Sequence, residues 1–145
     1  GLSLVGSEMC IRDRKIQLFN LYKKKTPVFL KISPDETDLN LKNIIQVAEK
    51  NNFDGFICSN TSAAHNYNVP GGMSGALLSK KSLEIQKKVC KFKSDKSILI
   101  ASGGIMSKED IESRFLNSAD LVQLYTGYIY YGNTLLKEAL KVSSS

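Results

Sequence analysis

From Lys15 onward, apolar runs of strand length alternate with amphipathic segments of helix length, and this alternation constrains the fold more than any other feature. It is typical of βα units that together build a parallel sheet. Four such units can be counted, with strands predicted at residues 28–33, 53–59, 97–102 and 120–125. The strands are almost continuously apolar, which predicts that both faces of the sheet are covered.

A helix is expected after each strand. Thr37 or Asp38 is the predicted N-cap of the first helix. Ser107, with Asp110 three residues later, has the spacing of a capping box and predicts the start of the third helix. The last helix is predicted near residues 133–141. The buried stripes expected on the first two helices are Leu41, Ile44, Ile45 and Ala48, and then Ile85, Val89 and Phe92.

The length limits this architecture, because the chain has 145 residues and a closed β/α barrel needs about 250. The predicted fold class is therefore α/β, with four βα units forming half of a TIM-type β/α barrel. Its inner sheet face and two strand edges would be exposed. Residues 1–14, GLSLVGSEMCIRDR, show no period and resemble translated sequencing adapter. We expect them to be a foreign segment, with residues 15–145 forming the half-barrel.

The formal net charge of +6 comes from lysine-rich stretches at residues 15–31 and 80–96. Nucleic-acid binding is not expected, because arginine is scarce and exposed aromatics are not interleaved with the lysines. The lysines either line solvated helix faces or attract anions such as phosphates and acidic lipid headgroups. Three cysteines without a CxxC pair favour a reducing compartment, with Cys58 and Cys90 in the core. No signal peptide or membrane-spanning run is visible, so we expect this segment to be soluble.

Functional groups of β/α barrels lie at the C-terminal ends of the strands. After the third and fourth predicted strands come Gly103 and Gly104, then Tyr125 and Thr126. Glycines there let backbone N–H groups approach phosphate oxygens, and a helix N-terminus adds to such a site. The pattern predicts a phosphate site, although each glycine also suits an ordinary turn.

The first two strand ends carry further polar groups. Lys31 lies inside an apolar strand, so we expect it to be buried and paired, either with a carboxylate or with an anionic ligand. Asn60 and Thr61 suit a planar ligand, or else a local turn. Gly75 ends GGMSG, which is either a loop that closes over a ligand or a plain turn. His65 is expected to be solvated, and no metal-ligand spacing occurs.

Five ordered motifs together carry a family resemblance: PVFLKISPDETD, DGFICSNTS, GGMSG, IASGGI and LVQLYTGYIYYG. Over about residues 26–141 they resemble the dihydroorotate dehydrogenase family, and GGMSG with LVQLYTG resembles its quinone-linked class. The resemblance implies the C-terminal half of an FMN enzyme of pyrimidine biosynthesis. Such an enzyme oxidises dihydroorotate to orotate, passes electrons to quinone, and lies peripherally on the inner or cytoplasmic membrane.

The resemblance also implies roles for single residues. Lys31 would contact the FMN ring and stabilise its reduced form, Ser59 stands where the family has a threonine, and Ser118 stands where it has a glycine. The implied orotate-binding residues are Asn60 and Thr61. The implied cofactor-binding residues are Lys31, Ser59, Gly75, Gly103, Gly104, Tyr125 and Thr126.

One departure from the family concerns activity. The family's serine base, several orotate-binding asparagines and other FMN loops precede the matching segment and have no counterpart here. No catalytic residue is therefore predicted, the isolated chain should be inactive, and quinone would bind through the missing N-terminal part. Two alternatives stay open: a non-enzymatic phosphate-binding or self-associating half-barrel, and another FMN barrel oxidoreductase that acts on a pyrimidine.

Overall fold

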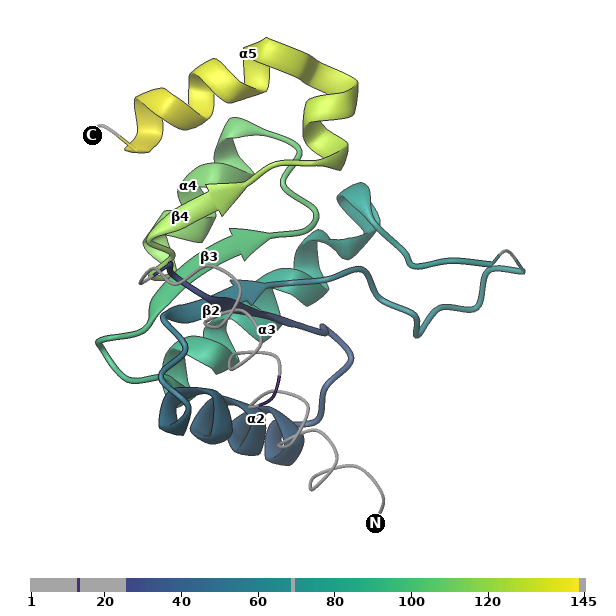
Figure 1. The fold of residues 1–145 in the computed structure, drawn as a ribbon. Helices are drawn as coiled ribbons and strands as arrows, with labels where there is room; N and C mark the ends of the chain where they lie inside the picture. The colour runs from purple at the N-terminus through teal and green to yellow at the C-terminus, as the bar shows by residue number, and fades with distance from the viewer. Residues whose placement is uncertain (1–12, 14–25, 69, 144–145) are drawn as a thin grey trace.

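The structure is a computed structural model that describes residue 13 and residues 26–68 and 70–143. It contains one parallel sheet of four strands in the order β1-β2-β3-β4 (Figure 1). The elements are β1 (Phe29–Ile32), α2 (Asp38–Lys50), β2 (Gly55–Cys58), a 3-10 turn η1 (Gly75–Leu78), α3 (Ser79–Phe92), β3 (Ile98–Ser102), α4 (Lys108–Leu116), β4 (Leu121–Gln123) and α5 (Thr126–Ser143). The predicted α/β fold class and the four βα units are confirmed.

The helices cover one face of the sheet (Figure 1). A row of residues in register across the strands, Leu30, Phe56 and Leu99, packs against α2 and α3 in one apolar cluster. A second cluster joins β3 to α4 and α5 through residues such as Ala101 and Ile111. Burial of these side chains supplies most of the force that holds the layers together.

The opposite face of the sheet is exposed in the described part of the chain. Its central row, in register, is Lys31, Ile57, Ile100 and Leu121. Leu121 is 55% exposed, and Ile98 on the same face is 39% exposed. This inner face therefore lacks the opposite wall that would cover it in a closed barrel, as expected for a half-barrel.

The helix starts agree with the sequence signals. Thr37 caps α2 by accepting a hydrogen bond from Asn40 N at 3.3 Å. Ser107 and Asp110 form the predicted capping box of α4. The strands are shorter at their ends than predicted, because backbone pairing stops before the apolar runs do. α5 begins earlier than predicted, at Thr126, and is interrupted at Gly132, whose φ is 54°. None of the helices in the described ranges is long and apolar enough to cross a membrane.

Two aspartates tie neighbouring strands together at the N-terminal edge of the sheet. Asp54, just before β2, accepts a hydrogen bond from Val28 N at 2.7 Å. Asp120, just before β4, accepts one from Leu99 N, also at 2.7 Å. The same device thus fixes the start of β1 against β2 and of β3 against β4, which leaves the opposite edge free to carry the loops of the site.

Candidate functional site

A pocket of about 100 Å³ lies at the C-terminal ends of the strands. Every site residue predicted from the sequence contributes to its wall, although these residues come from segments far apart in the chain. The lining residues are Lys31, Ser59, Asn60, Thr61, Ser74, Gly75, Leu78, Ser102, Gly103, Gly104, Ile105, Gln123, Tyr125, Thr126 and Gly127.

One end of the pocket is formed by the turn after β3. Gly103 and Gly104 have φ values of 92° and 70°, a region that L side chains rarely adopt. A Cβ on Gly104 would also collide with the backbone of Ser79. Both glycines are therefore required by the turn, and the turn brings backbone, without side chains, to the pocket wall.

The loop before η1 meets the start of α5 at the same end. The Thr126 hydroxyl lies 3.4 Å from Ser74 Oγ. A Cβ on Gly75 would come within 3.2 Å of the Thr126 side chain. Glycine backbone and two hydroxyls therefore line the pocket here, and backbone N–H groups and hydroxyls are donors that suit phosphate oxygens. A phosphate group fits this donor set.

Lys31 also lines the pocket, and here the sequence prediction needs correction. Lys31 is exposed, and no carboxylate in the described part of the chain pairs with it. The exposure has a simple cause, because Lys31 points to the sheet face that no described element covers. Its ammonium group is therefore free to meet an anionic or electron-rich ligand.

The segment after β2 supplies the polar groups beside Lys31. Ser59 is buried, and its N–H donates to Ser102 O at 2.6 Å. Asn60 N–H donates to Ile32 O at 2.8 Å, which fixes the segment against β1. Asn60 Oδ1 accepts from Thr61 N at 3.0 Å, a contact between adjacent residues that does not form the local turn considered for this pair. The Asn60 amide nitrogen and the Thr61 hydroxyl stay available to a ligand.

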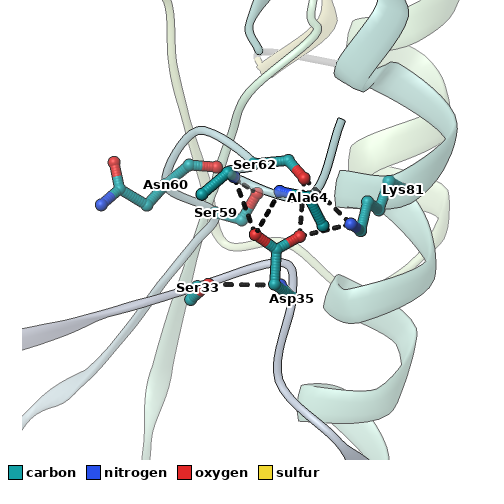
Figure 2. Close-up of polar contacts among 8 residues, drawn as sticks. Ser33, Asp35, Ser59, Asn60, Ser62, Ala64 and Lys81 are labelled. Carbon is teal, nitrogen blue, oxygen red and sulfur yellow. Dashed lines mark hydrogen bonds and ion pairs between the residues drawn. The ribbon is translucent and has the colours of Figure 1, made fainter. Parts of the chain in front are cut away.

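A carboxylate clamp, formed by Asp35, Ser62 and Lys81, holds this segment in place (Figure 2). Asp35 accepts from Ser62 Oγ at 2.6 Å and from Ala63 N at 2.8 Å, and it pairs with Lys81. Burial alone would raise the pKa of Asp35, but these hydrogen bonds outweigh it and lower the pKa to about 2. In Figure 2 the Asn60 side chain points away from the clamp. The clamp therefore orders the Asn60 segment without using its amide.

The long connection from β2 to η1 is braced internally. Ser62 and Met73 exchange two backbone hydrogen bonds, of 3.1 and 2.7 Å. His65 Nε2 lies 2.8 Å from Gly71 O, and His65 is half-buried, so it is only partly solvated. The GGMSG loop, residues 71–75, is consequently held next to Thr61. No His, Cys, Asp or Glu cluster in the described ranges could hold a metal ion.

Comparison with known proteins identifies the family. The sequence model of dihydroorotate dehydrogenase matches residues 7–142 of this chain. The chain belongs to the dihydroorotate dehydrogenase family. The match starts inside residues 1–14, whose foreign origin stays a prediction.

Curated and solved relatives agree with this assignment. Dihydroorotate dehydrogenase (quinone) of Shewanella oneidensis is 37% identical over 138 residues, covering 90% of this chain and 41% of that protein. The Shewanella baltica (strain OS185) enzyme of the same name is 38% identical over 135 residues, covering 88% of this chain and 40% of its own length. A crystal structure of DHODH from Eimeria tenella with ferulenol superposes with a TM-score of 0.75 and 30% identity, over 81% of this chain and 33% of that one. The chain thus spans about two fifths of the length of these curated relatives.

Part of the site in this dihydroorotate dehydrogenase family member was not predicted from the sequence. The Asp35 clamp was not predicted, although Asp35 follows the first strand directly, where barrel function is concentrated. Ser74 and Ser102 were also missed, because a single serine in a loop carries no distinctive signal. Ser118, where the family has glycine, has a φ of 65°, which explains physically why glycine suits that position.

Proposed function

We propose that this chain forms the FMN phosphate site and part of the orotate site of a dihydroorotate dehydrogenase that reduces quinone at a membrane surface. The observation that carries the proposal is the convergence of every predicted site residue on one pocket. Family membership supports the reaction class, and the printed name of the Shewanella relatives supports quinone as the acceptor.

The phosphate of FMN would lie at the glycine end of the pocket. Gly103 and Gly104 keep side chains out of the turn, and Thr126 adds a hydroxyl. Tyr125, 77% exposed, stands at the end of β4 beside Thr126 and could cover the phosphate from the solvent side. Donors of this kind bind a dianion through several short hydrogen bonds.

The ring of FMN and the orotate would lie toward Lys31. When bound, FMN supplies the ring that accepts two electrons from dihydroorotate. Lys31 would hold a positive charge beside that ring and so favour its reduced, anionic form. Asn60 and Thr61, ordered by the Asp35 clamp, would orient orotate through an amide and a hydroxyl. Ser59, buried behind them, would contact the ring from the strand end.

The pocket encloses only part of such a ligand pair. Its volume of about 100 Å³ is below the roughly 300 Å³ of ordinary small-molecule sites. This agrees with a site of which this chain forms one wall. The serine base implied by the family resemblance has no counterpart here, so we expect the 145-residue chain to bind but not to turn over substrate.

Flavin titration tests the proposal. The 145-residue chain is titrated with FMN and, separately, with riboflavin, which lacks the phosphate, and the quenching of flavin fluorescence is followed. We expect FMN to bind at least ten times more tightly than riboflavin. Equal affinities, or no binding of either flavin, would overturn the phosphate assignment.

Self-association is the second candidate, favoured by the exposed apolar residues Ile98 and Leu121 on the inner sheet face. Two copies could cover each other's open faces and complete a closed sheet. Size-exclusion chromatography with light scattering separates the two candidates. A discrete dimer that lacks flavin binding would favour self-association, whereas a flavin-binding monomer would favour the dehydrogenase.

A further inference from the structure

Arg114 of α4 is 1% exposed and has the largest fully buried side chain in the described part of the chain. Its Nη2 donates to Gly103 O at 3.0 Å, to Ser79 O at 3.1 Å and to Ser82 Oγ at 2.7 Å. Its Nη1 lies 3.4 Å from Gln86 Oε1. The guanidinium group thus sits directly behind the glycine turn of the pocket.

These hydrogen-bond partners are all neutral. Burial lowers the pKa of Arg114, and the Asp110 carboxylate nearby opposes that effect. Asp110 itself accepts from Ser79 Oγ at 3.3 Å and from Met106 N at 2.9 Å, and it forms no ion pair with Arg114. Arginine keeps its proton in proteins, so a positive charge without a directly bound anion lies under the turn.

The hydrogen bonds to Gly103 O also set the direction of the next N–H group. Arg114 Nη2 and Ser82 Oγ, the latter at 2.6 Å, both approach Gly103 O from the helix side. A trans peptide bond points its C=O and its N–H in opposite directions. The Gly104 N–H therefore points away from α3 and α4, toward the pocket that Gly104 lines. None of the described residues accepts a hydrogen bond from it.

We propose that Arg114 is a positioning residue for a phosphate group: it holds the Gly103–Gly104 peptide so that its N–H faces the pocket and places a buried positive charge behind it. The inference rests on the proposed phosphate site. An anion at Gly104 would complete the charge balance that no described carboxylate provides by direct contact. In a buried setting such a charge acts over longer distances than it does in water.

The test compares FMN with riboflavin, because only FMN carries the phosphate. Arg114→Met removes the charge and keeps much of the side-chain volume, whereas Arg114→Lys keeps the charge. We expect Arg114→Met to lower the preference for FMN over riboflavin at least tenfold, and Arg114→Lys to restore most of it. Riboflavin affinity should change little, which a merely structural role for Arg114 would not predict.

Gln86→Leu is the matched control, because Gln86 also contacts Arg114, and it donates to Arg114 O and Asn117 O at 2.9 Å. It should lower thermal stability and leave the FMN preference unchanged. A wild-type preference in folded Arg114→Met would overturn the role of Arg114. Absence of any preference in the wild-type chain would instead overturn the proposed phosphate site.

If circular dichroism shows Arg114→Met to be unfolded, an NMR titration of the wild-type chain gives a second test. The ¹⁵N-labelled wild-type chain is titrated with inorganic phosphate. The Gly104 amide and the Arg114 guanidinium resonances should shift together in one saturable transition. A transition that moves neither resonance would contradict the inference.

Discussion

At the scale of single residues, Asp35 connects more of the site than any residue named from the sequence. It joins the loop after β1, the segment after β2 and α3 through Ser62, Ala63 and Lys81. The pocket residues themselves could be predicted, because strand-end glycines and amides have a recognisable pattern. The clamp could not, because its members are common polar residues whose proximity arises only when two loops and a helix meet.

Asp35→Asn should destabilise the chain at neutral pH and much less at low pH. The pKa of folded Asp35 is lowered to about 2 from its ordinary value of 3.8. The stabilisation is therefore fully present above about pH 4 and is lost as the pH falls toward 2. Because the pair is partly exposed to solvent, we expect a loss of about 1 kcal/mol at pH 7.

Urea unfolding at pH 7 and at pH 2.5 measures this difference. Asp95→Asn is the control, since Asp95 is exposed in the turn before β3. A penalty for Asp35→Asn that is the same at both pH values would contradict the role of the ionised carboxylate.

Ser118→Gly should stabilise the chain. Ser118 has a φ of 65°, where an L residue is strained and glycine is not. Relief of that strain gains about 1 kcal/mol, from which the greater chain entropy of glycine subtracts a part. Ser113→Gly, within α4, is the control and should destabilise by about 0.5 kcal/mol. A lower melting temperature for both variants would show that the conformation of Ser118 is not strained.

At the scale of elements, the caps and stripes were predictable because they depend on neighbours within one turn. Ser107 with Asp110, and Thr37, cap their helices as expected. The short helical turn at the start of α5 was missed, because Gly127 and Gly132 suggest a loop. Gly132 does break the helix there, with a φ of 54°, but only after Thr126–Tyr131 have become helical.

Truncation of two neighbouring side chains in β3 should lower the free energy of unfolding by very different amounts. Leu99 faces the helices and is fully buried, whereas Ile100 faces the open side of the sheet. Leu99→Ala should lower the free energy of unfolding by about 3 kcal/mol. Ile100→Ala should lower it by roughly 1 kcal/mol, because Ile100 is only partly buried. Chemical denaturation of the two variants gives the comparison, and equal costs would mean that something covers the inner face in solution.

At the scale of the whole molecule, the sequence predicted a half-barrel from the number of βα units, and the structure has four strands with one open face. The expectation of a buried Lys31 failed for the same reason. A side chain on the inner face is buried only when an opposite wall exists, and the described residues form one wall. The match to 41% of the Shewanella oneidensis protein agrees with that geometry.

Dihydroorotate oxidation should be absent from the 145-residue chain even with FMN added, since the family's serine base has no counterpart in this sequence. Reduction of a dye by dihydroorotate measures it, with the chain and FMN at saturating concentration. Turnover above that of free FMN would contradict the expectation and would require a base among the residues present.

Amide shift mapping by NMR shows where FMN binds on the chain. It therefore tests directly whether FMN occupies the pocket at the strand ends. The ¹⁵N-labelled chain is titrated with FMN, and the shifted amides are assigned. The largest changes should fall on the pocket residues, with Gly104 and Thr126 responding to the phosphate and Lys31 and Asn60 to the ring. Changes centred instead on the lysine-rich surface of α3, or scattered over the molecule, would contradict it.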